Sequence, residues 1–305
     1  MAVGAMGLPR RGGMGGSGFL GGVQVAPAVV GLVPLQRVSG QYLQNVSRSY
    51  LYRRDYSAAA LTLFAAMGTQ PTQYRKMLYN NFILALQASG AWALMDCIYL
   101  LAAANSQAAL LNIKSPSTFT ATPINAPTFT ADRDYTGNAT SQVLDSGFNP
   151  ATAGGNMALN SAHVGLWCRT DNATGTGAAV GNLNTTLQNK SSALDTAVSR
   201  LNAGSTITTN GLPTGSLNHW VANRNNAANY DIWGGGSKAA SAIASATTAM
   251  SSLSFTMLGR QTAAATYQYN GYPMSAFHWG GALSDAQVLS VYNALYAFLH
   301  GVEAA

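Results

Sequence analysis

Hydrophobic positions in the last quarter of the chain change from a strand pattern to a helical one. Residues 253–260 and 267–279 are apolar or alternating over strand lengths and are separated by a polar turn. After Gly281, apolar side chains recur at helical spacing, and Ser284 stands at the start of this run as an N-cap. The apolar positions are Leu283, Val288, Val291, Leu295 and Phe298. The pattern predicts two strands that lead into a capped terminal helix.

From residue 115 onward, strand-length segments alternate with turn residues, a spacing typical of an antiparallel β-sandwich. The predicted strands are Phe119–Ile124, Pro127–Asp132, Ser141–Leu144, His163–Arg169, Thr206–Thr209, Trp220–Ala222 and Tyr230–Trp233. Segments 173–205 and 237–252 are rich in Ala, Ser, Thr and Asn, and we expect surface crossovers or weak strands there. Leu194–Leu201 is expected to form a helical turn. The chain is therefore predicted to be mainly β.

Alternation is clearest in the predicted strand 163–169. Val164, Leu166 and Cys168 alternate with aromatic or polar positions, so one side of this strand is expected to face the core. Cys168 and Cys97 both lie in apolar surroundings, without the spacing of a zinc site. Two buried thiols are therefore favoured over a disulfide.

A helical pattern occupies the region before the strands. Ala58–Met67 is a short Ala/Leu helix, Pro71 restarts the chain, and a second helix with one apolar side ends at Gly90. The segment Ala91–Asp96 then leads into a strand, Cys97–Ala102. The two helices are predicted to form a hairpin.

Positive charge is concentrated in the N-terminal quarter. Residues 1–76 hold eight basic side chains and one acidic one, whereas the remaining chain holds eight basic and nine acidic. The eight are Arg10, Arg11, Arg37, Arg48, Arg53, Arg54, Arg75 and Lys76. The domain that follows this quarter is thus nearly neutral.

Residues 1–40 are rich in Gly, Pro and Val, a composition that cannot bury a core of its own. We expect an extended arm that docks on an acidic protein partner, anchored through Arg10, Arg11, Arg48, Arg53 and Arg54. Tyrosines interleave with the last three arginines, but no nucleic-acid fold signature accompanies them, so no nucleic-acid partner is expected. The predicted divisions are an extended Gly/Pro-rich basic arm (1–46), a helical hairpin anchoring region (47–96) and a β-sandwich with a short C-terminal helix (97–305).

Three motifs of the closing segment are Leu-Gly-Arg (258–260), Tyr-Asn-Gly-Tyr (269–272) and Ala-Leu-Ser-Asp-Ala-Gln (282–287). Their order resembles the final strands and helix of laminin-G-like, concanavalin-type jelly rolls. The resemblance covers roughly residues 113–301 and implies two packed antiparallel sheets. Because many functions share this architecture, function has to be argued from other residues.

A second resemblance is carried by the run Arg75–Lys114 and by the stretches Phe119–Thr122, Pro127–Gly137 and Leu144–Pro150. These segments resemble tailed-bacteriophage virion proteins in which a helical hairpin leads into a laminin-G-like sandwich. The resemblance implies a virion protein assembled in the host cytoplasm. Its implied partners are other capsid, neck or tail subunits and copies of itself.

Residues for enzymatic chemistry are missing. Sandwich glycanases need two carboxylates, which a Glu-x-Asp-x-x-Glu pattern would supply, but Glu303 is the single glutamate of the chain. Asp132 and Asp134 border a turn and are expected to cap it. No Gly-x-Ser-x-Gly elbow occurs, the aspartates are too scattered for a calcium site, and no apolar run is long enough to cross a bilayer. We expect no enzyme, cofactor, metal or membrane insertion.

Aromatic, amide and guanidinium side chains gather in the segment 218–233, around a predicted hairpin turn. Aromatic faces bind the apolar side of a sugar ring, and amides or arginine bind its hydroxyls. The candidate glycan-binding residues are Trp220, Asn223, Arg224, Tyr230 and Trp233. Alternatively, this is an Asn-rich turn whose aromatic side chains pack between the sheets.

Two function classes follow from the sequence. In the first, a non-enzymatic virion structural protein is anchored by its arm and hairpin, and its sandwich projects outward to contact host-surface polysaccharide, as in a tail or fibre adhesin. In the second, the sandwich is purely architectural and decorates or cements the capsid, neck or tail without a ligand.

Overall fold

The computed structural model describes residues 55–170, 177–188, 197–210 and 218–304. The predicted arm (1–46) lies outside these residues, and so do the proposed anchoring residues Arg10, Arg11, Arg48, Arg53 and Arg54. From Tyr56 onward the chain forms one structural unit. The boundary predicted between residues 96 and 97 does not separate two domains, because it falls inside strand β1 (Met95–Leu100), which belongs to the larger sheet.

The helices begin at side chains that cap them. Helix α2 (Ala58–Ala66) follows Ser57 and helix α3 (Gln73–Ala88) follows Thr72, and each hydroxyl accepts a hydrogen bond from the first helical turn. Helix α6 (Asp285–Gly301) has the predicted N-cap, because Ser284 and Gln287 form a reciprocal capping box. Two single-turn helices are α4 (Ala91–Leu94) and α5 (Ser106–Ala109).

Replacing Ser284 with alanine is expected to lower the free energy of unfolding by about 1 kcal/mol, because the first turn of α6 loses its side-chain acceptor. Urea unfolding measures the loss. Ser290→Ala is the matched control, since the Ser290 hydroxyl bonds only the Ala286 carbonyl inside the same helix. Equal losses in the two variants would contradict the assigned role of the cap.

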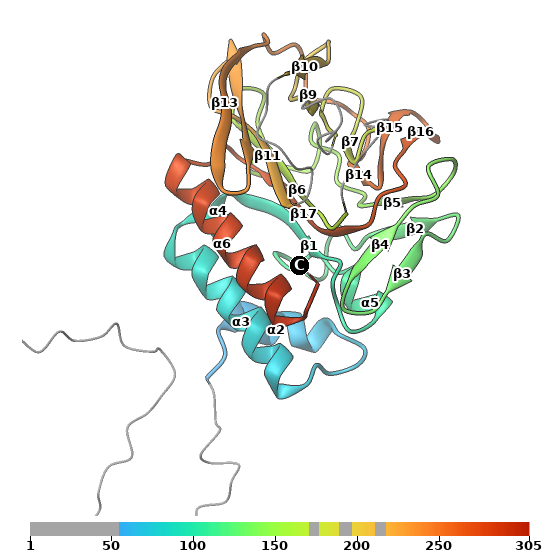
Figure 1. Cartoon of the computed structure of the whole chain (residues 1–305), viewed down its shortest axis with the longest axis vertical. Helices are drawn as coiled ribbons and strands as arrows, with labels where there is room; N and C mark the ends of the chain where they lie inside the picture. The colour runs from blue at the N-terminus through green and yellow to red at the C-terminus, as the bar shows by residue number, and fades with distance from the viewer. Residues whose placement is uncertain (1–54, 171–176, 189–196, 211–217, 305) are drawn as a thin grey trace, which may run out of the picture. The chain divides into compact units, whose positions relative to one another are not determined.

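Helices α3 and α6 pack side by side and antiparallel (Figure 1). The Tyr74 hydroxyl donates to the Gly301 carbonyl (3.1 Å), and the Gln287 amide donates to the Ser89 carbonyl (3.3 Å). The start of each helix thus lies beside the end of the other. Between these contacts the ring of Phe298 packs on Tyr79 and Phe82.

Among the described residues, the larger sheet (sheet A) has eight strands in the order β13-β12-β11-β6-β17-β4-β3, and β1 pairs with β17. Every pairing in it is antiparallel. Besides β1, its strands are β3 (Thr128–Thr130), β4 (Asp134–Thr136), β6 (Ala162–Cys168), β11 (Asn218–Arg224), β12 (Asn229–Gly234), β13 (Ser237–Ala244) and β17 (Met274–Gly280).

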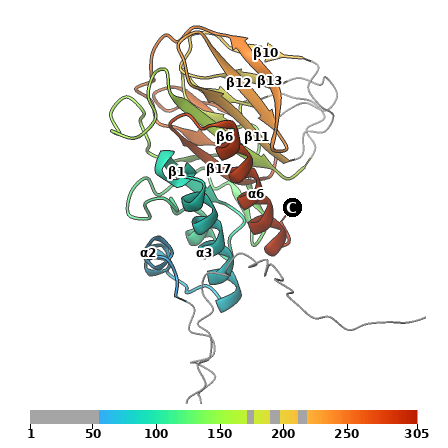
Figure 2. The same ribbon diagram turned by 90° about the vertical axis from the view of Figure 1, so that its left-hand side faces the viewer.

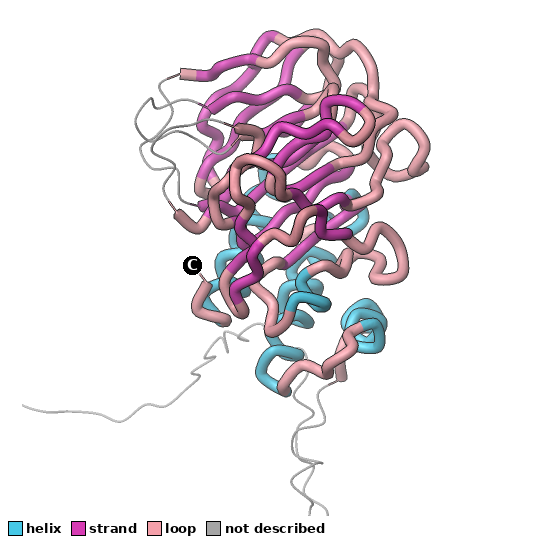
Figure 3. Tube along the Cα trace, turned by 90° about the vertical axis from the view of Figure 1, so that its right-hand side faces the viewer, coloured by secondary structure: helices cyan, strands magenta, loops and turns pink. Residues whose placement is uncertain are grey.

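The second sheet (sheet B) has the strand order β10-β9-β8-β7-β14-β5-β2 within the described part of the chain. Its strands are β2 (Thr122–Ile124), β5 (Val143–Asp145), β7 (Val180–Gly181), β8 (Thr186–Leu187), β9 (Ala197–Arg200), β10 (Ile207–Thr209) and β14 (Thr256–Met257). A separate hairpin follows, formed by β15 (Gly259–Ala263) and β16 (Thr266–Tyr269). The strands stack in two layers, with the helices gathered on one side (Figures 2 and 3).

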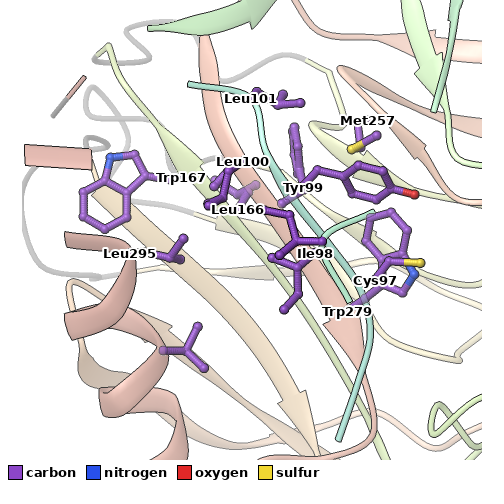
Figure 4. Close-up of a cluster of buried hydrophobic side chains, with 14 of the residues drawn as sticks. Cys97, Ile98, Tyr99, Leu100, Leu101, Leu166, Trp167, Met257, Trp279 and Leu295 are labelled. Carbon is purple, nitrogen blue, oxygen red and sulfur yellow. The ribbon is translucent and has the colours of Figure 1, made fainter. Parts of the chain in front are cut away.

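Both faces of the central strands β6 and β17 of sheet A are buried. On one face Trp279 stacks on Phe255, 4.9 Å between ring centroids, next to sheet B. On the other face Trp167 stacks on Tyr292 of α6 at 5.9 Å. Figure 4 shows Trp167 and Leu295 on one side of the strands and Trp279 on the other. The protein is thus an antiparallel β-sandwich with helices over the outer face of sheet A.

The helical layer over sheet A corrects one expectation from the sequence. Only one side of the strand 163–169 was expected to face the core, but every residue of β6 is buried, because α6 covers the second side. Two further expectations are wrong in part. Ala197–Arg200, inside the expected helical turn, is strand β9, and Ser237–Ala244 is a full strand paired with β12. Cys97 and Cys168 are both buried thiols, as predicted.

No helix within the described ranges is long and apolar enough to cross a membrane.

Candidate functional site

The five residues predicted to bind glycan lie on the β11–β12 hairpin, and the protein covers all of them. Trp220, Asn223, Arg224, Tyr230 and Trp233 are each at most 6% exposed. Trp220, Arg224 and Tyr230 point between the two sheets. Asn223 and Trp233 point toward the helical layer. A sugar cannot stack on covered rings. In this structure the five side chains therefore form no shared binding surface, and the alternative of packed aromatics describes them.

Arg224 has a structural role that its sequence context did not reveal. It is fully buried, and its guanidinium donates to four backbone carbonyls, of Leu201 (2.9 Å), Asn226 (3.2 Å), Asn229 (3.2 Å) and Ser245 (2.8 Å). Its guanidinium also lies over the Tyr230 ring, 5.3 Å from the centroid. Arg224 thus links the β11–β12 hairpin to the segments that carry Leu201 and Ser245.

The closest acidic pair does not make a catalytic dyad. Asp132 forms an ion pair with Arg75, and Asp134 accepts from Arg169 Nε at 2.8 Å and from the Thr136 hydroxyl at 3.0 Å. Each carboxylate is therefore held by a different cation. In the described part of the chain no group of three or more His, Cys, Asp or Glu side chains is arranged to hold a metal ion.

Three histidines meet beneath α6, on the helix-facing side of sheet A. His219 Nε2 and His278 Nε2 share a hydrogen bond of 2.8 Å, and the His163 ring lies 5.1 Å from that of His278. His163 Nδ1 donates to the Gly281 carbonyl at 2.5 Å. Gly165 makes room for the cluster, because a Cβ there would lie 2.2 Å from the His278 ring.

Burial keeps this histidine cluster neutral. It lowers the pKa of His163 to about 4 and that of His219 to about 3, and it lowers the pKa of His278 well below the ordinary value. The neighbouring imidazoles depress the pKa of His219 and His278 further. His163 Nε2 and His278 Nδ1 have no partner among the described residues. Since the helical layer covers the rings, they serve the fold rather than acid–base chemistry.

A polar row crosses the face of sheet B that points away from sheet A. Ser199 bonds Tyr230 between the sheets, so the next residue, Arg200, points outward. Arg200 is paired directly with Thr186 on β8, and that row continues through Gly181 of β7 to Thr256 of β14. Cross-strand neighbours of this kind lie about 5 Å apart.

The β15–β16 hairpin adds a second arginine to this face. The Thr256 hydroxyl donates to the Gly259 carbonyl (3.1 Å), which ties the start of β15 to the polar row. Arg260 Nε donates to the Gln268 side chain across the hairpin (2.6 Å). Burial, together with the positive charge of Arg260, lowers the pKa of Arg200 to about 10.

We call Arg200, Arg260 and Thr186 the arginine cradle. Sequence reasoning missed it, since strands β7 and β8 are two residues long and show no alternation. The one signal was an arginine directly after the Leu-Gly pair at the end of a predicted strand.

An open groove of about 410 Å³ lies between α3 and α6. Leu78, Phe82, Ala294 and Phe298 line it, and no charged side chain contributes. On α6, Leu289 and Tyr296 are also exposed, by 46% and 44%. Exposed apolar surface of this kind is typical of a protein contact.

No protein-family model matches the chain, and no curated protein matches it in sequence. One solved structure that is similar to this chain is that of botulinum neurotoxin type C, whose entry into cells depends on interaction with two ganglioside molecules. The chains are 10% identical over 68% of this chain and 53% of that one, with a TM-score of 0.43.

Two other similar structures come from different organisms. A mutant Trypanosoma rangeli sialidase with trans-sialidase activity is 8% identical over 73% of this chain and 39% of its own, with a TM-score of 0.46. Domain 4 of the Geobacillus stearothermophilus extracellular arabinanase AbnA, in complex with arabinotriose, is 13% identical over 66% of this chain and 98% of its own, with a TM-score of 0.37. The chain thus spans about half or less of the first two chains. TM-scores of this size do not establish a shared fold, so the fold assignment rests on the strand order itself.

Proposed function

We propose that this chain is a non-enzymatic structural protein of a bacteriophage virion, anchored on its helical side, whose β-sandwich contacts a host-surface glycan. The virion part is supported by the sequence resemblance over residues 70–170. The glycan part is supported by one observation, the outward-facing row of sheet B that carries Arg200 beside Thr186, with Arg260 on the adjoining hairpin. Tyr267 and Tyr269 are half-buried on the adjoining hairpin with ring centroids 6.2 Å apart, and strand alternation places them on the opposite side of that hairpin from Arg260.

The order of the layers supports this division of labour. Sheet A has α6 on one face and sheet B on the other, so the α3–α6 groove and the polar face of sheet B lie on opposite sides of sheet A. A particle contact through the uncharged groove would therefore not involve sheet B or the β15–β16 hairpin. Both contacts can therefore exist in one molecule.

Binding of the full-length folded protein to a panel of immobilised host polysaccharides tests the glycan contact. We expect retention on at least one polysaccharide and unchanged retention by Trp220→Phe, because that covered ring is outside the proposed surface. A folded protein that no polysaccharide retains would sink the glycan proposal.

A charge placed in the α3–α6 groove tests the anchoring side. Ala297→Arg is expected to fold, because residue 297 is an exposed helix position, and to lower incorporation into particles by roughly tenfold or more. An unpaired charge buried in a protein contact costs several kcal/mol, which corresponds to such a factor. Incorporation is measured by the amount of protein in purified particles.

Ala286→Arg is the matched control, because residue 286 is exposed on the same helix but outside the groove. It should be incorporated normally. Normal incorporation of Ala297→Arg as well would show that the groove is not the attachment surface.

The second candidate is an architectural capsid, neck or tail protein without a ligand. The uncharged groove favours it as much as it favours the first candidate, because both need an attachment surface. The two candidates differ only in the result expected from the polysaccharide panel, because an architectural protein should be retained by none of the polysaccharides.

A further inference from the structure

We infer that the groove between α3 and α6 binds a second copy of this chain, so that two molecules pair through their helical faces. The inference rests on the proposed attachment surface and names its partner. In a particle, the contact through the groove is then one between neighbouring copies, each of which offers the same surface to the other.

On α3 and α6, every charged side chain already has a contact within its own molecule. Three residues of these two described helices carry a full charge at neutral pH. They are Arg75, Lys76 and Asp285, which contact Asp132, the Phe64 ring and Lys238, respectively. Two copies can therefore meet through these helices without repulsion between like charges.

The outer side of α3 carries a largely apolar stripe, apart from the stripe that packs on the core. Tyr74, Leu78, Asn81 and Ala85 follow one another at spacings of four, three and four residues. Tyr74 is 55% exposed, and the other three line the groove. In Figures 1 and 2 no other described helix or strand crosses over α3 and α6. A helix that faces only water normally carries charged and polar residues there, whereas this spacing suits contact with another helix.

On α6 a row of large side chains runs beside a row of small ones. Leu289 and Tyr296 are exposed and lie seven residues apart. Ser290 and Ala297, which line the groove, have the same spacing. Seven residues make about two helical turns, so each row runs along the helix for roughly 10 Å. In a pair related by a two-fold axis, the large row of each copy can lie in the small row of the other.

Two amides in the groove suit the same partner. Asn81 of α3 and Asn293 of α6 both line it. A side-chain amide donates and accepts hydrogen bonds, so it can pair with the identical amide of a second copy. An asparagine at a helix contact also selects one register of the two surfaces. The polar positions of the groove are therefore complementary to themselves, as a contact between copies requires.

The helical face is large enough for a weak dimer. Helices α3 and α6 have 16 and 17 residues, so each is roughly 25 Å long. Two adjacent helices are roughly 20 Å wide, which gives a face of about 500 Å² per copy and about 1,000 Å² for the pair. A stable interface begins at about that area. We therefore expect a dissociation constant on the order of 10 μM.

Sedimentation velocity of the purified full-length protein, at concentrations from about 1 to about 100 μM, tests the pairing. We expect a monomer–dimer equilibrium that shifts toward the dimer as the concentration rises. Ala297→Arg should raise the dissociation constant roughly hundredfold or more, because a two-fold contact receives the unpaired charge twice. Ala85→Arg, from the α3 side of the groove, should do the same.

Ala264→Arg is the matched control, because residue 264 is exposed in the turn between β15 and β16, away from the helices (Figure 1). It should form the dimer normally. Circular dichroism shows whether each variant folds, and if one groove variant does not fold, the other decides. A protein that stays monomeric at about 100 μM, or a dimer that survives both groove variants, would overturn the inference.

Particle incorporation separates this inference from the proposed attachment. If the purified protein is monomeric but Ala297→Arg still enters particles poorly, the groove binds a different virion protein, so the second copy fails as its partner and the attachment stands. A groove-dependent dimer whose Ala297→Arg variant enters particles normally would keep the inference and sink the attachment.

Discussion

Lowering the pH from about 7 to about 5 is expected to remove on the order of 5 kcal/mol from the free energy of unfolding. The loss comes from His163, His219 and His278, which are held uncharged between sheet A and α6. Because folded domains are stable by only about 5–15 kcal/mol, the protein should be close to unfolding at the lower pH.

The sign follows from proton binding. Burial lowers the folded-state pKa of His163 to about 4 and of His219 to about 3, and depresses that of His278 strongly, whereas an unfolded imidazole titrates near 6.5. Below about pH 6.5 the unfolded chain therefore binds more protons, and stability falls as the pH falls. At pH 5 each histidine lowers the free energy of unfolding by about 2 kcal/mol. The full stability contribution is present above the unfolded pKa.

The geometry supports the same sign. His219 and His278 share one hydrogen bond between their Nε2 atoms, so one proton lies between them and a second would place two N–H groups face to face. Tyr292 of α6 and Trp167 of β6 pack against this pair, and no described ion pair includes any of the three histidines. Within the described ranges, no ion pair therefore compensates an added proton in the cluster.

Urea unfolding followed by tryptophan fluorescence at pH 7, 6 and 5 measures this loss. His219→Gln should weaken the pH dependence, because one of the three titrating groups is gone, and His300→Gln should not, since His300 is exposed. Identical unfolding midpoints at pH 5 and 7 would contradict a neutral buried cluster.

Replacing Arg224 with alanine is expected to cost about 3–5 kcal/mol, because four buried carbonyls lose their donor at about 1 kcal/mol or more each. The variant leaves the carbonyls of Leu201, Asn226, Asn229 and Ser245 without their donor. Arg224→Lys should lose about half as much, because an ammonium cannot reach all four acceptors at once. Thermal and urea unfolding measure both losses.

Arg133→Gln serves as the control, with an expected loss below about 1 kcal/mol for one partly exposed bond to a backbone carbonyl. The variant also discriminates between two roles of the β11–β12 hairpin. If Arg224→Ala kept its stability but lost polysaccharide retention, the hairpin would be a ligand site after all.

Local signals in the sequence predicted most of the elements. Ser284 and Gln287 at capping-box spacing placed the start of α6, and Pro71 and Gly90 bracketed α3 within two residues. The alternation in 163–169 likewise placed β6. These signals are carried by neighbouring residues, so they can be read without knowing the tertiary fold.

The third layer and the cradle depend on contacts between distant residues. The apolar stripe of α6 shows that the helix is buried on one side, but not that His163 and Trp167 lie beneath it. The neighbourhood of Arg200 and Thr186 depends on a register between strands of four and two residues, too short to show alternation.

The hairpin 218–233 shows a different limit. A segment that contains an arginine among tryptophans, tyrosines and asparagines has the same composition in both cases. Its arginine can bind sugar at the surface or backbone carbonyls inside the protein. The burial of this arginine is decided by sheet B, which covers the side of the hairpin that carries Arg224 and Tyr230. Composition alone therefore could not distinguish a surface site from aromatic side chains packed between the sheets.

We propose that the ligand binds on the outer face of sheet B, and hydrogen–deuterium exchange of the full-length protein tests this most directly. The measurement compares the free protein with the protein bound to a polysaccharide that retains it. We predict added protection in residues 177–188 and 256–269, which carry the row and the β15–β16 hairpin, and none in α3 and α6. Protection confined to residues 218–234 or to the helices would contradict the proposed position of the ligand.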